Sequence, residues 1–140
     1  MDYRKEYEKW LASPALSEDE RAELRALEGN DKEIKARFYG PLEFGTAGLR
    51  GTMYTGLHNM NRHVIRWATQ GFANVIRAEG TEAMQKGIAV CMDCRNHSAE
   101  FARETACVMA ANGIHVRLFE SLRPTPELSF AVREYGCQAG

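Results

Sequence analysis

The sequence predicts an α/β fold: a three-layer α/β/α sandwich with a mixed, mostly parallel sheet, preceded by an N-terminal helical arm. The first forty residues are highly charged and carry helix-start signals. From Leu42 onward, short apolar runs alternate with helical patterns across short connections, which is typical of crossover units and a largely parallel sheet. We therefore divide the chain into a helical arm, residues 1–40, and an α/β domain, residues 41–140.

Local signals predict three helices in the arm. Ser17 and Glu20 have the spacing of a capping box, in which each side chain accepts a hydrogen bond from the other residue's backbone N–H, and Gly29 ends that helix. Further helices are expected from about Tyr3 to Ala12 and from about Asp31 to Tyr39. Such charged helices have narrow apolar stripes and cannot make a core alone. We expect the arm to pack as a cap on the domain and to serve as scaffold or interface.

The domain alternates between the two kinds of element. An apolar pair just before the glycines that begin at Gly45 looks like the end of a first strand, and helical spacing of apolar residues follows the cap residue Asn61. The later predicted elements are the strand "GIAVCMD" at 87–93, a helix capped by Ser98, the strand "IHVRLF" at 114–119, and a helix capped by Thr125, with Pro126 in its first turn, that ends at Gly136.

The last four residues, "CQAG", follow a helix stop and look like the first residues of another strand. We therefore expect the domain to be incomplete at its C-terminus. An unpaired sheet edge is a template for pairing, so we also expect the chain to be capable of self-association through that edge.

Composition excludes some classes of partner. Lys and Arg total 18 and Asp and Glu total 19, so no global field attracts nucleic acid or a membrane. No run of about 18 apolar residues occurs, and the N-terminus lacks the basic-then-apolar pattern of a signal peptide. We expect a cytoplasmic protein. Its four cysteines, Cys91, Cys94, Cys107 and Cys137, should then be free thiols, mostly buried.

The stretch "LEFGTAGLRGTMY", residues 42–54, is the first candidate site. Glycines at Gly45, Gly48 and Gly51 let the backbone turn its N–H groups inward, Thr46 adds a hydroxyl, and Arg50 supplies a planar fork suited to phosphate or carboxylate. In open α/β sheets, ligands lie beyond the carboxyl ends of strands, where we expect this loop. The stretch matches neither the phosphate loop nor the dinucleotide fingerprint, so an ordinary glycine-rich turn is the alternative.

The stretch "DCRNHS", residues 93–98, allows two interpretations. Asp93 has the chemistry of a metal ligand or base, and His97 that of a proton shuttle. However, Asp93 and Arg95 beside a helix start more often organise a loop by hydrogen bonds and an ion pair. We favour the structural role and expect His97 to face solvent. Arg123 in "RPTPE" could point to the ligand side of the sheet, but we expect an ordinary solvated loop arginine.

The "CMDC" spacing at Cys91 and Cys94 formally matches a metal or redox motif. Zinc needs four ligands, and no second pair lies at a usable distance. A redox pair would open a helix, whereas Cys91 lies in a predicted strand. We therefore interpret both cysteines as core residues. The sequence also contains no serine in a nucleophile elbow and no aspartate cluster for magnesium.

Taken together, several segments resemble one family. They are "FGTAGLRG" at 44–51, "MN" at 60–61, "TQGFA" at 69–73, "DCRNHS" at 93–98 and "PTPELSFAV" at 124–132. They occur in the order seen in bacterial phosphoglucomutases and phosphomannomutases. The chain thus resembles the first domain of the α-D-phosphohexomutase superfamily, truncated before the phosphoserine loop, and the resemblance covers nearly the whole chain.

The resemblance implies a function for a longer protein. Family members have four domains and move a phosphoryl group between the 1- and 6-positions of a hexose phosphate such as that of glucose or mannose, or between the 1- and 5-positions of a pentose phosphate. The transfer passes through a phosphoserine and a bisphosphate intermediate, and which sugar this protein uses stays open. They use one Mg²⁺ ion and a sugar bisphosphate activator, and their catalysis rests on positioning and positive charge. The phosphoserine is expected beyond Gly140 and the magnesium aspartates in the second domain. We therefore expect no catalytic or metal-binding residue in this chain and no activity from it alone.

The residues carried over from the family are few. Thr46, Ala47, Gly48 and Arg50 match the family loop that lines the phosphate site, with Ala47 where some relatives have serine. The implied partners are sugar phosphates and the remaining domains of the parent enzyme. The alternative is a stand-alone, non-catalytic domain that binds a sugar phosphate or another protein.

Overall fold

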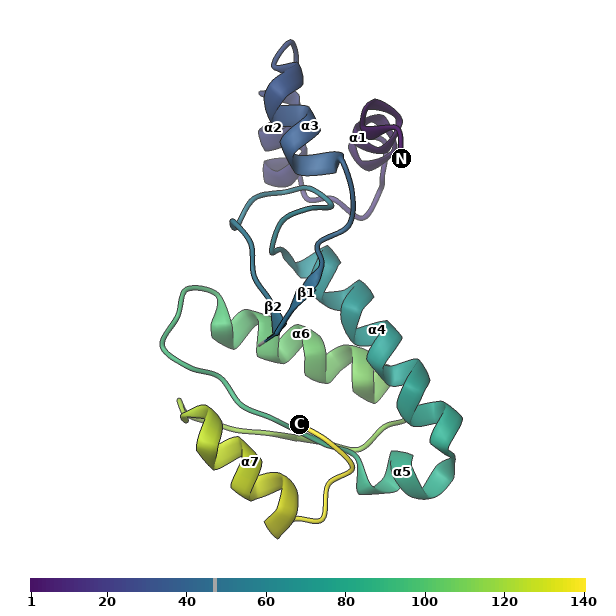
Figure 1. Ribbon diagram of the computed structural model, residues 1–140, viewed down its shortest axis with the longest axis vertical. Helices are drawn as coiled ribbons and strands as arrows, with labels where there is room; N and C mark the ends of the chain where they lie inside the picture. The colour runs from purple at the N-terminus through teal and green to yellow at the C-terminus, as the bar shows by residue number, and fades with distance from the viewer. Residues whose placement is uncertain (47) are drawn as a thin grey trace. The chain divides into compact units, whose positions relative to one another are not determined.

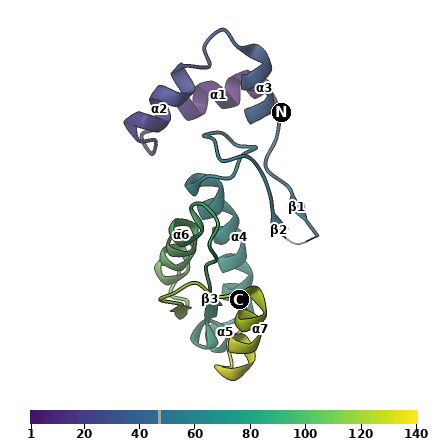
Figure 2. The same cartoon turned by 90° about the vertical axis from the view of Figure 1, so that its left-hand side faces the viewer.

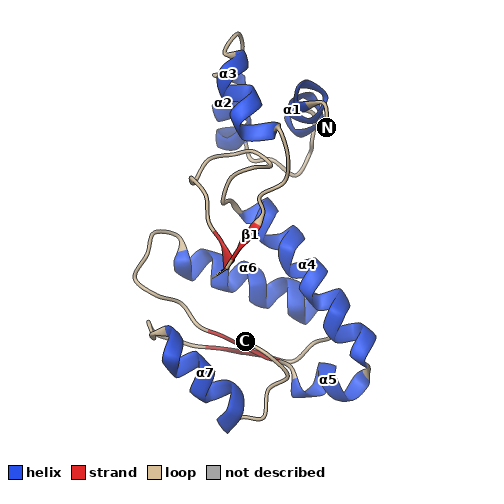
Figure 3. Cartoon of the chain, viewed as in Figure 1, coloured by secondary structure: helices blue, strands red, loops and turns tan. Residues whose placement is uncertain are grey.

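The computed structural model describes residues 1–46 and 48–140. They form two compact units, residues 1–64 and residues 65–140, which are described one at a time below. The described part of the chain is mixed α/β: it is mostly helical and contains two small two-stranded sheets (Figure 1, Figure 3). No helix among the described residues is long and apolar enough to cross a membrane.

The first unit begins with the three predicted helices. They are α1 (Tyr3–Leu11), α2 (Glu18–Arg25) and α3 (Asp31–Phe38). The capping box is present: Ser17 Oγ accepts from the Glu20 N–H, and the Glu20 carboxylate accepts from the Ser17 N–H at 2.7 Å. Helix α2 ends at Arg25, and Gly29 follows with a φ of +82°, a conformation that favours glycine.

The three helices share a hydrophobic core, which the charged composition of the arm did not lead us to expect. Phe38 is fully buried, and the rings of Tyr7 and Trp10 meet it edge-on, with centroid distances of 5.6 and 5.7 Å. Of the described buried members of this core, Leu57 alone lies outside residues 1–40, in the segment that precedes α4 (Arg62–Glu79). The remaining buried members of this core are Leu16, Leu24, Leu27 and Ile34.

A short antiparallel hairpin follows in the first unit. Strand β1 (Phe44–Gly45) pairs with β2 (Gly48–Leu49), so that Phe44 lies opposite Leu49 and Gly45 opposite Gly48. The prediction that this segment follows a strand of the parallel sheet is therefore wrong. Its glycines close a tight antiparallel turn, and the two strands pair with each other.

The second unit is built around a parallel strand pair. Strand β3 (Ile88–Val90) pairs with β4 (Val116–Leu118) in the register Ile88 to Val116. Helix α6 (Ser98–Ala111) connects them, as expected for a crossover unit. Helices α4 (Arg62–Glu79), whose first turn belongs to the first unit, and α6 lie side by side on one face of the strands, and α7 (Thr125–Glu134) lies on the other (Figure 1, Figure 2). The short helix α5 (Thr81–Lys86) precedes β3.

The core of this unit lies between α4, α6 and the strands. Ala73 and Met109 are completely buried, and Ile76, Ile88 and Ile114 are almost so. Polar contacts also join α4 to α6. Arg66 Nη2 donates to Glu104 Oε1 at 2.9 Å, and Thr69 Oγ1 lies 3.4 Å from Thr105 Oγ1.

Two predicted helix caps are wrong. Ser98 is the first residue of α6 rather than its cap, because its hydroxyl accepts from the Asp93 N–H at 3.0 Å while His97 precedes the helix in a left-handed conformation, φ +62°. Helix α7 begins at Thr125, and Pro124 occupies the cap position. The stop at Gly136, with φ +60°, is as predicted.

Of the strand predicted for the last four residues, the structure shows a single bridge, at Ala139. Ala139 forms a parallel bridge with Ile88, and the Ala89 N–H donates to Ala139 O at 3.0 Å. A Cβ added at Gly140 would lie 2.7 Å from Val132 Cγ2 of α7, so glycine is required where this strand passes under the helix. Strand β3 is thereby flanked on both sides.

The cysteine prediction is half right. All four cysteines are free. However, Cys94 and Cys107 are exposed, and Cys91 and Cys137 are half-buried, so the expectation that most of them are buried is wrong.

Candidate phosphate-binding loop

The predicted site residues lie on the β1–β2 hairpin. Thr46 occupies the turn, and Ala47 lies outside the described residues. Gly48 has a φ of +112°, which a residue with a side chain rarely adopts. Arg50 directly follows β2 and is exposed; among the described residues its guanidinium makes no hydrogen bond or ion pair. A positive charge without an internal partner is thus available to an anion at the base of the hairpin.

The loop after the hairpin is tied at its ends. The Met60 N–H donates to Thr52 O at 2.9 Å, and Thr52 Oγ1 donates to Asn59 Oδ1 at 2.8 Å. Gly51 allows this closure, because a Cβ there would lie 3.2 Å from Leu42 Cδ1 and 3.4 Å from Met60 N. Arg50 therefore projects from a backbone that is held on its C-terminal side.

The Asn61 side chain joins this loop to α4. Its oxygen accepts from the N–H groups of His63 and Val64, both at 3.1 Å, which confirms the predicted cap. Its nitrogen donates to Tyr54 O at 3.0 Å and to Gly56 O at 2.8 Å. One amide thus fixes both the start of the helix and the shape of the loop.

The loop also packs closely on α3. Gly56 has a φ of +145°, and a Cβ there would lie 2.9 Å from Arg37 Cβ. The Arg37 guanidinium lies 4.4 Å from the centre of the Tyr54 ring. The side-chain nitrogen of Asn59 is buried and has no hydrogen-bond partner among the described residues.

His58 fastens the chain before the hairpin. Its Nδ1 lies 3.2 Å from Gly40 O and 3.3 Å from Pro41 O, and its Nε2 lies 2.5 Å from the Tyr39 hydroxyl. Because a carbonyl oxygen can only accept, Nδ1 carries the proton, and the Tyr39 hydroxyl donates to Nε2. The hairpin is therefore held on its N-terminal side as well.

The loop at 93–98 has the structural role that we favoured. The Asp93 carboxylate accepts from the Arg95 N–H at 3.0 Å, and this hydrogen bond, with one from the Ser98 side chain, holds the pKa of Asp93 below its ordinary value. An ionised carboxylate engaged in this way is a poor base at neutral pH. His97 is exposed, as expected, and its Nδ1 contacts the Glu100 carboxylate.

The Arg123 side chain forms an ion pair within the described part of the chain, in contrast to that of Arg50. Its Nε lies 2.8 Å from Glu127 Oε1, and its backbone N–H donates to Met92 O at 2.9 Å. The second contact ties the loop after β4 to the end of β3. Arg123 therefore organises the loops at this edge of the sheet.

The cysteines Cys91 and Cys94 are both free thiols. No group of three or more His, Cys, Asp or Glu side chains that could hold a metal ion occurs among the residues that the structure describes. Burial raises the pKa of the Cys91 thiol, which is the opposite of what a reactive thiolate needs. In particular, the described residues offer no fit for a magnesium ion.

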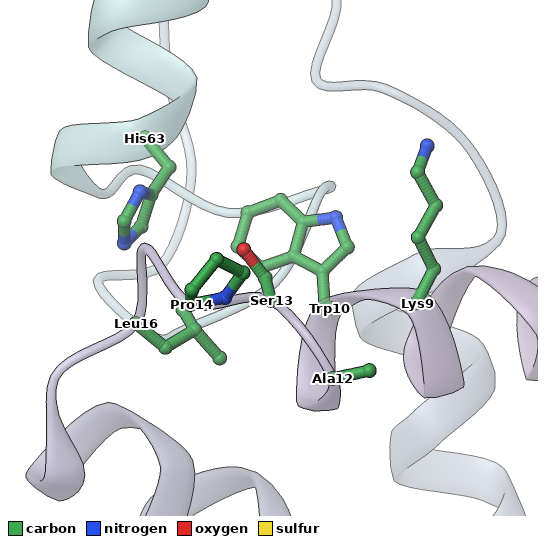
Figure 4. A pocket seen from close by; sticks show the side chains of 7 residues that line it. All are labelled: Lys9, Trp10, Ala12, Ser13, Pro14, Leu16 and His63. Atoms are coloured by element: carbon green, nitrogen blue, oxygen red, sulfur yellow. The ribbon is translucent and has the colours of Figure 1, made fainter.

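A pocket of about 480 Å³ in the first unit was not anticipated from the sequence. Trp10, Pro14 and Leu16 give it an apolar wall, and His63 and Lys9 stand at its two sides (Figure 4). Ala12 and Ser13 complete the lining. Its volume is in the range of small-molecule sites, and its walls suit an apolar or aromatic group. No local signal could have brought His63 to the other lining residues, which all lie between Lys9 and Leu16.

His63 is fixed beside this pocket by Glu20. His63 Nε2 lies 3.1 Å from Glu20 Oε1, and Arg62 Nη2 donates to Glu20 Oε2 at 2.7 Å. Burial by itself raises the pKa of Glu20, but the hydrogen bonds from Ser17 and the neighbouring His63 and Arg62 outweigh it, so the pKa lies below its ordinary value. The capping box of α2 thus also binds the first turn of α4.

Comparison with known proteins gives a consistent result. Residues 41–140 match the family model described as phosphoglucomutase/phosphomannomutase, alpha/beta/alpha domain I. A human phosphopentomutase is 39% identical over 119 residues, which cover 81% of this chain and 19% of that protein. A phosphoglucomutase from Staphylococcus saprophyticus is 36% identical over 110 residues, covering 79% of this chain and 19% of that enzyme.

A more distant relative covers more of the chain. A phosphomannomutase from Mycoplasma pneumoniae is 29% identical over 137 residues, which cover 96% of this chain and 24% of that protein. This chain therefore spans about a fifth to a quarter of the length of these curated relatives. No solved structure gives a significant match.

Proposed function

Because the chain belongs to the phosphoglucomutase/phosphomannomutase family, we propose that it is the N-terminal portion of a phosphohexomutase. The parent enzyme would interconvert the 1-phosphate and 6-phosphate of glucose or mannose through a phosphoserine and a bisphosphate intermediate. The family match and the names of the relatives, which include a phosphopentomutase, support a sugar-phosphate mutase.

The observation that supports a phosphate-binding role is the state of Arg50. Thr46, Ala47, Gly48 and Arg50 are the proposed phosphate-binding residues. Of the described ones, Arg50 alone carries a charge, it is exposed, and its guanidinium has no partner among the described residues. A guanidinium binds phosphate oxygens through two parallel hydrogen bonds, and exposure leaves that fork free.

The binding groups are held for this task by the rest of the loop. The closures at Thr52–Met60 and at His58 fix the chain on both sides of the hairpin. Phosphoryl transfer depends mostly on positioning and on positive charge at the phosphoryl oxygens. The role of this loop would be to hold a phosphoryl group, and the group that carries it would come from elsewhere.

The position of the terminal strand supports the proposed place of the phosphoserine. Ala139 lies beside Ile88 in parallel register. A strand that continued from Gly140 would run along β3 toward the same edge as Asp93 and Arg123. We propose that the serine of the parent enzyme follows this strand, and that the completed sheet has the layered α/β/α form described for domain I. We also propose that domain I comprises residues 41–140 and that residues 1–40 are a helical arm added before it.

The described residues offer no site for the proposed cofactor. The family resemblance implies Mg²⁺, and the described residues contain no suitable ligand cluster. We propose, from the family resemblance, that the ion is held by the second domain of the parent enzyme, and no step of the proposal depends on its binding here. The chain alone should accordingly be inactive.

The test compares three variants of the parent enzyme: Arg50→Ala, Arg50→Lys and the control Arg103→Ala. The control removes an exposed arginine on α6, away from the hairpin sequence. With glucose 1-phosphate, Mg²⁺ and glucose 1,6-bisphosphate, Arg50→Ala should lower kcat/KM by a factor of about 100 or more, the loss expected when a preorganised charge contact to a transferring phosphoryl group is removed. Arg50→Lys should recover only part of it. Full activity of Arg50→Ala, or turnover by the 140-residue chain alone, would refute the proposal.

A further inference from the structure

Helix α4 is apolar on two opposite sides. Its inner side carries Thr69, Ala73 and Ile76, which are at most 7% exposed. The opposite side carries Trp67, Gly71 and Val75, spaced four residues apart, and Trp67 and Val75 are 59% and 56% exposed. A helix of a water-soluble unit normally has a polar outer side, and one that is apolar on both sides is normally covered on both.

Gly71 at the centre of this outer stripe is unexplained by the unit itself. It lies well inside an 18-residue helix, where glycine weakens helical structure. Nothing lies within 4 Å of the position that its Cβ would occupy. No contact within the unit therefore requires glycine, whereas a second backbone that approaches the helix from outside would.

We propose that the stripe Trp67–Gly71–Val75 is a docking surface for a second copy of this chain. Two α4 helices packed antiparallel about a two-fold axis at Gly71 would place Trp67 of each copy against Val75 of the other, because both lie four residues from the axis. Such an isologous contact uses the same patch twice, and the patch has the symmetry for it. Antiparallel helices also align their dipoles favourably.

The charge pattern permits contact between identical surfaces. The stripe itself contains no charged residue. The polar residues on one flank are the amides Gln70 and Asn74, joined by a hydrogen bond of 2.9 Å. The Gln70 amide is also paired in both directions with Asn112 of α6, so Asn74 is the amide that can meet its copy. Neither side chain carries a charge, so the flank brings no like-charge repulsion. Phe72, 37% exposed, lies toward the other flank and adds apolar area there.

The exposed area sets the strength of the contact. Covering Trp67, Phe72 and Val75 removes roughly 300 Å² of apolar surface from each copy, which is less than the roughly 800 Å² that each partner buries in a standard specific interface. The dimer should therefore be reversible and of micromolar or weaker affinity, so that it forms and dissociates as concentration changes.

The experiment is sedimentation equilibrium of the 140-residue chain over a wide concentration range. The unmodified chain should change from monomer to dimer as concentration rises. Gly71→Leu and Val75→Glu should each weaken association at least tenfold, whereas the control Ala99→Leu, at an exposed position on α6, should not. Gly71→Leu also removes a glycine from an exposed helix, so its thermal midpoint should not fall.

A second readout locates the contact. The indole N–H signal of Trp67, assigned by its loss in Trp67→Phe, should shift with concentration, and that of Trp10 should not. A chain that stays monomeric throughout would overturn the proposal. So would a dimer that is unaffected by both variants, because the contact would then lie elsewhere, for example at the sheet edge.

Discussion

Replacing Glu23 by alanine removes the centre of a polar network that fastens the loop after the hairpin to helices α2 and α3. The two carboxylate oxygens accept from Arg37 Nη1 and from Thr55 Oγ1, each at 2.5 Å, and the Thr55 N–H lies 3.2 Å away. The Arg37 side chain is only 9% exposed. Without the Glu23 carboxylate, the hydroxyl and the N–H of buried Thr55 both lose their acceptor. The buried Arg37 guanidinium loses one of its two carboxylate partners and keeps the other.

The structure sets the size of the effect. Breaking a buried ion pair costs about 3–5 kcal/mol when the remaining charge is left alone. Here Glu33 remains 2.9 Å from Arg37 Nε, and the Glu23 side chain is 36% exposed, so water replaces part of the loss. We expect Glu23→Ala to lower the free energy of unfolding of residues 1–64 by about 2 kcal/mol. For a unit of this size that corresponds to a thermal midpoint lower by roughly 10 °C.

Trp10 fluorescence provides the assay. Trp10 contacts Phe38 in the core of this unit, and a Trp67→Phe background makes it the sole tryptophan. Urea unfolding should be compared for Glu23→Ala, Thr55→Val and the double variant, with Glu8→Ala as an exposed control. The coupling energy between Glu23 and Thr55 should be about 1 kcal/mol. Strictly additive changes, or a midpoint for Glu23→Ala equal to that of the control, would refute this account of the network.

Two other predictions concern titration and reactivity. The pKa of Glu20 lies below its ordinary value of 4.5, so its interactions stabilise the fold above that pH and are lost as the pH falls through the lowered pKa. Glu20→Gln should therefore remove part of the acid-induced loss of stability. An unchanged slope of unfolding free energy against pH in this variant would contradict the prediction. Cys91 has a raised pKa and is half-buried, whereas Cys94 is exposed, so iodoacetamide at neutral pH should label Cys94 several-fold faster, as peptide mass spectrometry would measure; equal rates would oppose the assignment.

The elements predicted correctly depend on interactions between residues close in sequence. The Ser17–Glu20 capping box and the Asn61 cap each span three residues, so their residue types nearly determine the structure. The alternation that predicted β3, α6 and β4 likewise follows from local periodicity. Gly136, just past the last turn of α7, is a local stop signal of the same kind.

The errors arise where a competing partner, or an open side of the fold, overrides the local rule. The Ser98 hydroxyl is taken by the Asp93 N–H, which a cap rule does not foresee. The strand expected before Gly45 pairs with the residues after it, because a tight turn at the glycines makes that pairing available first. Cys107 lies on a helix whose outer side is open, so the burial typical of cysteine does not apply to it.

For the site, the sequence identified Arg50 by its chemistry but not the supports around it. The Tyr39–His58 contact and the closure of Thr52 on Met60 join residues through the fold of the loop. The family resemblance indicated the loop as a whole, and the structure adds that Arg50, unlike Arg123, keeps its guanidinium free of partners among the described residues.

The double role of Asn61 has a consequence for how this region opens. Its oxygen holds the N–H groups of His63 and Val64, and its nitrogen holds two carbonyls of the loop. The first turn of α4 therefore cannot fray without loosening the loop, and the loop cannot unfold without exposing the helix start. The two form one cooperative unit of local unfolding, whose amide protons should exchange with solvent in a single event. The hairpin next to this unit should therefore keep its geometry until the loop and the first turn of α4 unfold together.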